Sequence, residues 1–276
     1  MNAFFSPLGV IKTLALSIEH QAARSSEKIS QKLIMLATPQ KRLNEVNVMI
    51  SVVVDVDDTL VDTGRRMQGV WRELLGVAVP LEAVETLSLE QMFMKFASVE
   101  QKTRVKEFQK RFWDVVLCLD EAGVGLMRLH EAVPFAANVL QKWSKKCRLV
   151  YLTGRTENMR ELTLAELKKF GFPVDGVELM MFRVKDYGRA RGVNPSGITL
   201  IDAKKRLFAS LAKWYDVVRA IDDYPGYFPI FRDFDVPDRI GLLRSKRYKP
   251  QQYIEQGATR VVESWKEIEG DLPKLS

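Results

Sequence analysis

The sequence is poor in the two residue types that most often build metal centres and nucleophilic sites. Its 276 residues include only two cysteines, Cys118 and Cys147, and two histidines, His20 and His130. Two cysteines cannot form a disulfide framework, and two histidines leave little room for histidine-based zinc chemistry or a Ser-His-Asp triad. The composition therefore indicates a cytoplasmic protein with reduced thiols, in which any catalysis uses carboxylates, lysine and hydroxyls.

Long apolar runs are also missing. No stretch approaches the roughly 18 uninterrupted apolar residues that cross a bilayer, so we expect no membrane partner. Hydrophobic residues make up 46% of the chain, enough for one large core or for a core with a smaller module. The formal charge of +7 and the pI near 9.3 suit an anionic substrate such as a phosphate ester or nucleic acid. They suit an ordinary basic protein slightly better.

Residues 1–48 differ from the rest of the chain. Ser6 and Pro7 are typical of a helix start, and apolar residues then recur at three-four spacing up to Pro39. We interpret the segment as an N-terminal helical extension that packs on a partner or on the body of the protein. The alternative is that translation starts at Met49, directly before the first predicted strand.

From residue 49 onward, strand and helix patterns alternate. The expected strands are 51–56, 148–153, 177–182, 217–221 and 239–243, and the expected helices lie near 132–146, 156–170, 199–214 and 224–232. Near-continuous apolar strands separated by helices are typical of a parallel sheet covered on both faces. The sequence therefore predicts an α/β fold, a Rossmann-like three-layer sandwich with a parallel sheet.

The stretch between the first two predicted strands is too long for one crossover helix. Residues 65–129 are rich in helix formers and are predicted to form a helical cap, inserted after the first strand. The catalytic core is then assigned to residues 49–64 and 130–250, and a C-terminal helical tail to residues 251–276. The basic segment RSKRYK (244–249) follows the last strand, either as a phosphate or nucleic-acid contact or as a solvated exit loop.

Polar side chains of particular types follow the predicted strands, at the edge where an open parallel sheet binds ligands. In chain order they are Asp55, Asp57 and Thr59, then Thr153, Gly154 and Arg155, then Lys204 or Lys205 at a helix start, and finally Asp222 and Asp223. Carboxylates that converge repel one another and lose hydration, so the cluster requires a cation. Mg²⁺ prefers oxygen ligands and is the predicted cofactor, with Asp55, Asp222 and, as a further candidate, Asp223 as ligands.

This combination predicts phosphoryl chemistry, because a lysine, a hydroxyl and a divalent ion together cradle phosphoryl oxygens. Asp55 at the strand end can attack phosphorus and form an acyl phosphate. Asp57, on the same side of an extended chain, can protonate the leaving oxygen and then deprotonate the hydrolytic water. Lys204 is preferred to Lys205 because the apolar residues that follow it fit a core-facing helix.

The motifs resemble those of the haloacid dehalogenase superfamily over roughly residues 50–243. DVDDTL resembles its DxDxT first motif, LTGR the second, a lysine that opens a helix the third, and IDD the acidic fourth. The resemblance implies a Rossmann-like, Mg²⁺-dependent phosphatase in which Asp55 is nucleophile and metal ligand. Asp57 becomes the acid/base and binds the metal through its backbone carbonyl. The other implied roles are phosphate binding by Thr153, charge balance by Lys204, and metal binding by Asp222 and Asp223.

Two longer stretches of sequence resemble one branch of this superfamily in particular. YLTGRTENMRELTLAELKKFGFP and AIDDYP look most like the acid-phosphatase and polynucleotide-phosphatase branch. The expected activity is hydrolysis of a phosphomonoester through an aspartyl phosphate, on a phosphorylated small molecule, a nucleotide or a nucleic-acid end. Phosphotransferase or phosphomutase activity on a small metabolite is the other alternative. Thr59, Thr153, Gly154 and Arg155 are the candidates for substrate binding, and a surface position is an equal alternative for Arg155.

Overall fold

The computed structural model describes residues 50–187 and 199–271, so the predicted extension at 1–48 lies outside the described residues. At its centre is a six-stranded parallel sheet in the order β5-β4-β1-β6-β7-β8. Its strands are β1 (Ser51–Val54), β4 (Arg148–Thr156), β5 (Glu178–Phe182), β6 (Val217–Asp222), β7 (Asp238–Leu242) and β8 (Arg260–Val262). All five predicted strands are present, with small shifts at their ends.

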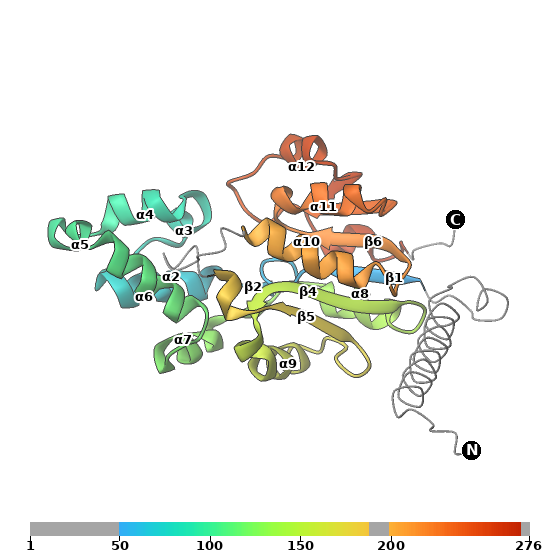
Figure 1. Cartoon of the computed structure of the whole chain (residues 1–276), viewed down its shortest axis with the longest axis horizontal. Coiled ribbons are helices and arrows are strands. Elements are labelled where there is room, and N and C mark those ends of the chain that lie inside the picture. The colour runs from blue at the N-terminus through green and yellow to red at the C-terminus, as the bar shows by residue number, and fades with distance from the viewer. Residues whose placement is uncertain (1–49, 188–198, 272–276) are drawn as a thin grey trace, which may run out of the picture. The chain divides into compact units, whose positions relative to one another are not determined.

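Helices cover both faces of this sheet (Figure 1). They are α8 (Ala136–Trp143), α9 (Arg160–Lys169), α10 (Leu200–Leu211), α11 (Phe228–Asp233) and α12 (Pro250–Gln256), with the short turns η3 (Glu157–Met159), η4 (Val184–Tyr187), η5 (Pro225–Tyr227) and η6 (Trp265–Ile268). Side chains alternate along β1, so Val52 and Val54 join the apolar cluster of α8 and α9. Val53 joins the opposite cluster, with α10 and α11. The predicted three-layer α/β sandwich is confirmed.

The C-terminal segment differs from the predicted helical tail. After α12 the chain forms β8, which pairs with β7 through Leu242 and Val262 and extends the sheet by one strand. The turn η6 then buries Trp265, whose indole N–H donates to the Thr59 carbonyl over 2.8 Å. The strand was missed because its three residues carry little signal of their own, and their conformation depends on pairing with β7.

Between β1 and β4 the chain leaves the sheet and forms a helical unit, the cap. The antiparallel strands β2 (Val61–Asp62) and β3 (Glu131–Ala132) pair where the chain leaves and returns. The cap helices are α2 (Gly64–Leu75), α3 (Leu81–Thr86), α4 (Leu89–Phe96), α5 (Val99–Thr103), α6 (Val105–Val116), α7 (Glu121–Leu126) and η2 (Met127–Leu129). They share a separate apolar cluster around Trp71 and Phe112. None of the described helices, in cap or core, is long and apolar enough to span a membrane.

Candidate active site

A tight turn after β1 holds the first group of polar residues. The Asp55 N–H donates to the Ile221 carbonyl of β6 over 2.9 Å, so Asp55 still lies in the sheet. The chain then turns at Asp58, which has a φ of 57° and donates its N–H to the Val61 carbonyl. The Asp58 carboxylate accepts hydrogen bonds from the Thr63 N–H and hydroxyl, at 2.9 and 2.7 Å. Asp58 therefore stabilises the turn, and Asp55 is left buried at the strand end.

Lys204, on α10, lies at the centre of the site and is fully buried. Its ammonium donates to Asp55 Oδ1 at 2.8 Å and to Asp222 Oδ2 at 2.7 Å. Lys205, the alternative, forms an ion pair with Asp233 that is half exposed to solvent. Burial alone would lower the pKa of Lys204, but Asp222 and Asp55 raise it above its ordinary value. Of the two lysines, only Lys204 brings a positive charge to the carboxylates.

Three carboxylates meet beside this lysine. One oxygen from each of Asp55, Asp222 and Asp223 lies within 4.8 Å of the others. In the described part of the chain no lysine or arginine pairs with Asp223, whose side chain accepts a 3.4 Å hydrogen bond from the Thr59 hydroxyl. Thr59, predicted to bind substrate, therefore contacts a carboxylate. The single charge of Lys204 cannot balance three carboxylates, and a divalent cation with oxygen ligands would complete the set.

The pKa values show how strongly the bare cluster resists ionisation. Burial raises the pKa of Asp55 to about 8, an effect that Lys204 opposes and Asp222 increases. Burial, followed by the charges of Asp58 and Asp222, raises the pKa of Asp223 well above its ordinary value. Carboxyl groups of this kind release their protons when a metal ion binds. The donor set therefore fits Mg²⁺ both by its geometry and by its excess negative charge.

The neighbouring strand β4 brings the second predicted motif to the same edge, because Tyr151 of β4 lies opposite Val54 of β1. Thr153 is fully buried, and its hydroxyl accepts a hydrogen bond from the Arg155 N–H over 3.1 Å. Gly154, the next residue, lines a cavity that Asp55 also lines. The two residues thus lie at the strand end where a phosphate bound next to Asp55 would be placed.

Arg155 is neither at the surface nor free in the cavity. Its side chain is only 2% exposed. Its Nε and Nη2 atoms donate to Asp57 Oδ1 at 3.0 and 2.8 Å, and its Nη1 atom donates to Glu166 Oε2 at 2.6 Å. Glu166 Oε1 in turn lies 2.6 Å from His130 Nδ1. The surface alternative for Arg155 is wrong, and its guanidinium is directed to two carboxylates where a phosphate contact was predicted.

This buried network controls the ionisation of Asp57. Burial alone would raise the pKa of Asp57, but the charge and hydrogen bonds of Arg155 lower it below its ordinary value. Sequence reasoning missed Glu166, which accepts a hydrogen bond from Arg155 Nη1, on the side of the guanidinium away from Asp57. The available signal was a glutamate on the buried side of α9, beside the buried Leu167. A single sequence gives no means to pair it with Arg155.

Two cavities of about 620 and 570 Å³ adjoin the carboxylates. The residues that line both are Asp57, Asp58, Arg66, Val116, Asp223 and Tyr224. The larger cavity extends under the cap, whose Met67, Trp71 and Phe112 give it an apolar wall. A ligand bound at Asp57 and Asp223 therefore has room for an organic group on the cap side.

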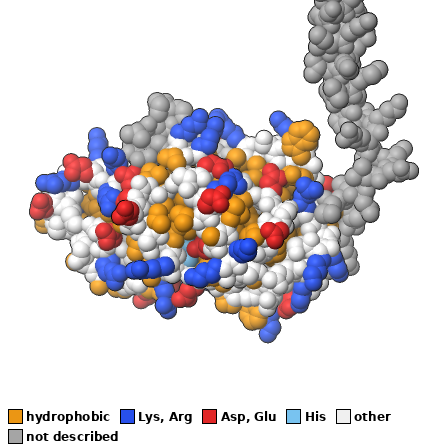
Figure 2. Space-filling model, turned by 90° about the horizontal axis from the view of Figure 1, so that it is seen from below, with side chains coloured by type: hydrophobic (Ala, Val, Ile, Leu, Met, Phe, Trp, Pro, Cys, Tyr) orange, Lys and Arg blue, Asp and Glu red, His pale blue; other side chains and the backbone are white. Residues whose placement is uncertain are grey.

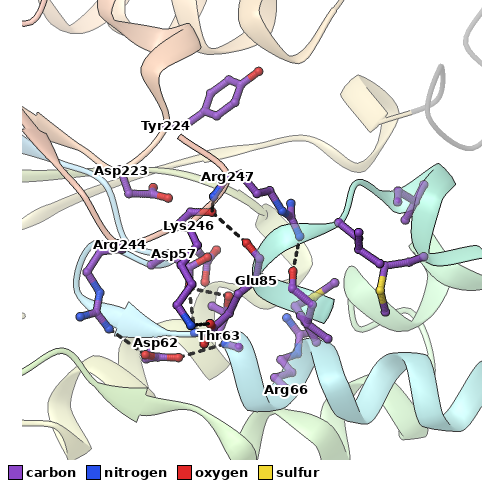
Figure 3. A pocket seen from close by; sticks show the side chains of 18 of the residues that line it. Asp57, Asp62, Thr63, Arg66, Glu85, Asp223, Tyr224, Arg244, Lys246 and Arg247 are labelled. Atoms are coloured by element: carbon purple, nitrogen blue, oxygen red, sulfur yellow. Dashed lines mark hydrogen bonds and ion pairs between the residues drawn. The ribbon is translucent and has the colours of Figure 1, made fainter. Parts of the chain in front are cut away.

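The basic segment after β7 forms the opposite rim of the larger cavity (Figure 3). Arg244 pairs with Asp62 at 2.8 Å, and Lys246 pairs with Glu85 of α3 at 2.9 Å. The guanidinium of Arg247 donates to the Val84 carbonyl. Lys246, Arg247 and Lys249 are exposed to solvent, as the alternative of a solvated exit loop predicts. The contacts of Lys246 and Arg247 also join the core to the cap beside the cavity.

No protein-family profile and no curated protein matches the sequence. Solved structures do match the fold. A haloacid dehalogenase-like family protein from Streptococcus pneumoniae has a TM-score of 0.51 and 13% identity, covering 82% of this chain and 99% of its own. A predicted phosphatase from Clostridium acetobutylicum has a TM-score of 0.54 and 16% identity, covering 81% and 98%.

A third match is a haloacid dehalogenase-superfamily hydrolase, subfamily IA, from Geobacter sulfurreducens. Its TM-score is 0.50 with 13% identity, and the match covers 82% of this chain and 97% of that protein. The chain therefore has the fold of haloacid dehalogenase-like hydrolases. None of these three proteins is described as an acid or polynucleotide phosphatase, so that narrower resemblance stays a prediction.

Proposed function

We propose that the protein is a Mg²⁺-dependent phosphomonoester hydrolase that forms a phosphoryl intermediate on Asp55. The observation that carries the proposal is the buried Lys204 ammonium, 2.8 Å from Asp55 and 2.7 Å from Asp222, with Asp223 beside them. A structural ion pair needs one carboxylate, and a second and third at the same point lower stability. Their presence at the edge of a cavity favours a site for a cation and an anionic substrate.

In the first half of the reaction, a carboxylate oxygen of Asp55 attacks phosphorus and the bond to the leaving oxygen breaks. Asp57 gives that oxygen a proton, which it must take up before this step because Arg155 favours its carboxylate form in the free protein. Lys204, Thr153 and Gly154 are assigned to the phosphoryl oxygens, because they lie at the same sheet edge. When bound by Asp55, Asp222, Asp223 and the Asp57 carbonyl, Mg²⁺ would neutralise the negative charge that gathers at this point.

In the second half, water attacks phosphorus and the bond between phosphorus and the Asp55 oxygen breaks, which frees phosphate and regenerates the carboxylate. The ionised Asp57 accepts the proton of this water. Its contact with Arg155 supports that role, because it favours the carboxylate form. The cap would cover the larger cavity during both steps and limit the access of bulk water.

The test is phosphate release from an aryl phosphate by the purified protein. With Mg²⁺ the wild type should be active, and Asp55→Asn should lower the rate by about three orders of magnitude or more. Asp175→Asn is a matched control, because Asp175 is exposed and does not line either cavity. Full activity of Asp55→Asn, or of the wild type in excess chelator, would refute the proposal.

Nucleic-acid ends are the narrower substrate class that the sequence predicts. On the face that Figure 2 shows, basic and acidic side chains lie interspersed, whereas a backbone-binding surface usually gathers basic residues in a band. A small phosphorylated molecule is the first substrate class to test, because the cavity of about 620 Å³ beside Asp57 and Asp223 has room for one. Preference for a phosphorylated oligonucleotide over sugar phosphates, with a steep salt dependence, would instead favour the nucleic-acid end. Phosphate transfer to an added alcohol would identify a phosphotransferase.

A further inference from the structure

Arg66 of cap helix α2 is a buried cation that the proposed chemistry does not use. Its residue is 4% exposed. Its Nη2 atom donates to the Val116 carbonyl at 2.7 Å, and it also lies 3.4 Å from the Val115 carbonyl and 3.2 Å from Cys118 Sγ. One nitrogen of the guanidinium thus fastens α2 to the end of α6.

The other two nitrogens of Arg66 have no acceptor among the described residues. Nε is buried without a hydrogen-bond partner, and Nη1 forms no hydrogen bond. No described carboxylate forms an ion pair with Arg66, whereas Arg155, which is equally buried, has Asp57 and Glu166. Asp57 and Glu166 act on Arg66 only from a distance, and both already pair with Arg155. A buried charge without a partner in contact is unfavourable. Burial accordingly lowers the pKa of Arg66 below its ordinary value.

The position of Arg66 indicates which part of a substrate could supply its missing hydrogen-bond acceptor. It lines both cavities, together with Asp57 and Asp223 (Figure 3). It belongs to the cap, whereas Lys204 and Thr153, assigned to the transferred phosphoryl group, belong to the sheet side. A group that contacts Arg66 is therefore on the cap side of the substrate, in the part that leaves.

We propose that Arg66 binds a second anionic group, located in the leaving part of the substrate. This inference rests on the proposed phosphomonoesterase function and narrows its substrate class to doubly anionic phosphate esters. The planar guanidinium matches a carboxylate or a second phosphate, to which Nη1 can donate a charge-assisted hydrogen bond. The apolar side chains of Met67, Trp71 and Phe112 would contact the carbon part between the two anions.

A purely structural role for Arg66 predicts a different behaviour. The contacts with Val115, Val116 and Cys118 engage one nitrogen and need no positive charge, so a neutral amide donor could supply them. Such a role gives no discrimination between an anionic and a neutral leaving part. If Arg66 instead contacted the transferred phosphoryl group, replacing Arg66 would weaken the binding of every substrate equally.

The experiment uses phosphonates, which carry carbon in place of the leaving oxygen and are not hydrolysed. Calorimetry in Mg²⁺ would measure binding of ω-phosphonocarboxylic acids of increasing length, and of the amide of each acid. A second arm would compare α,ω-bisphosphonates with alkylphosphonates of equal length. The proteins are the wild type, Arg66→Gln, Arg66→Lys and the control Arg72→Met, which changes an exposed arginine of the same helix.

At the best-fitting length, the wild type and Arg72→Met should bind the doubly anionic ligand about 10- to 100-fold more tightly than its neutral partner. Arg66→Gln should bind both about equally, and Arg66→Lys should keep part of the preference. The arm in which the preference appears identifies the group as carboxylate or phosphate, and either result supports the inference. The inference is overturned if the wild type binds acid and amide equally, and each bisphosphonate and its alkylphosphonate equally, at every length. This outcome does not depend on whether the variants fold.

Two further results would also overturn the inference: a preference that survives in Arg66→Gln, or an equal loss of affinity for both members of each pair. Failure of the hydrolase proposal is separable, because binding of phosphonates needs no turnover. A protein that prefers the doubly anionic phosphonate but releases no phosphate from any ester refutes the hydrolase alone. A protein that hydrolyses esters without any such preference refutes the role of Arg66 alone.

Discussion

Replacing Asp55 by asparagine should stabilise the metal-free protein at neutral pH, although it removes a proposed catalytic group. The pKa of Asp55 is raised from 3.8 to about 8, mainly by burial and further by Asp222, against the opposing effect of Lys204. A carboxyl whose pKa is higher in the folded state holds its proton there, so its contribution to stability is present below 3.8 and is lost as the pH rises toward about 8.

The size of the effect follows from the same values. At pH 7 the unfolded chain has released this proton and the folded chain has kept it. This pH lies about three units above the pKa of the unfolded chain, and each unit corresponds to about 1.4 kcal/mol. The shift therefore lowers the free energy of unfolding by about 4 kcal/mol relative to acid pH. Asparagine resembles the protonated form at every pH but gives Lys204 a weaker acceptor. We therefore expect a net gain of about 2–4 kcal/mol for Asp55→Asn.

Urea unfolding in chelator, between about pH 5 and about pH 8, measures this difference. The wild type and Asp175→Asn should lose stability as the pH rises, and Asp55→Asn should lose less, since only the raised pKa of Asp55 is removed and those of Asp222 and Asp223 remain. Added Mg²⁺ should stabilise the wild type more than Asp55→Asn, because a ligand that binds only the folded state raises its stability by mass action. A variant less stable than the wild type at about pH 8 in chelator would refute the reasoning.

Three more substitutions, two of them with a matched control, test the site, its buried network and the cap. Lys204→Met should lower the free energy of unfolding by about 3–5 kcal/mol in urea without metal, because buried carboxylates lose their cation. Lys205→Met removes an exposed pair and should cost less than about 1 kcal/mol. Burial would raise the pKa of Glu166, but its histidine and arginine partners lower it below 4.5. The charge of Glu166 therefore stabilises the fold at neutral pH, and this contribution is lost as the pH falls through its lowered pKa. The deficit of Glu166→Gln, about 1–3 kcal/mol at neutral pH, should shrink in acid, and equal deficits at both pH values would contradict this. Gly123→Ala would place a Cβ 2.2 Å from a backbone oxygen and should destabilise by about 1–3 kcal/mol in thermal melts. Gly125→Ala meets nothing within 4 Å and is its control.

The convergence of Asp55 and Asp222 could be predicted from the sequence, because both follow apolar strands and the carboxyl ends of parallel strands share one edge. The choice of Lys204 over Lys205 also followed from a local pattern, the helical register of apolar residues. These features depend on short stretches of chain and on one general rule of topology. The structure places the Lys204 ammonium within hydrogen-bond distance of both carboxylates.

The contacts that the sequence did not reveal join residues far apart in the chain. Arg155 reaches Asp57 across 98 positions, and nothing near Arg155 indicates that it is buried. Arg66 lies in a helix with several other charged residues, and its burial depends on how α2 packs against α6. Pairings of this kind are fixed by tertiary packing, which a single sequence does not encode in any local pattern.

The most direct test of the site is to identify the residue that carries the phosphoryl group. Wild-type protein would be quenched in acid during turnover of an aryl phosphate with Mg²⁺ and reduced with borohydride, which converts an aspartyl phosphate to homoserine. Mass spectrometry of the peptide that contains residue 55 would then locate the change. We predict homoserine in place of Asp55, only when substrate was present. Rapid phosphate release with an unmodified Asp55 peptide and the reduced residue elsewhere would contradict it.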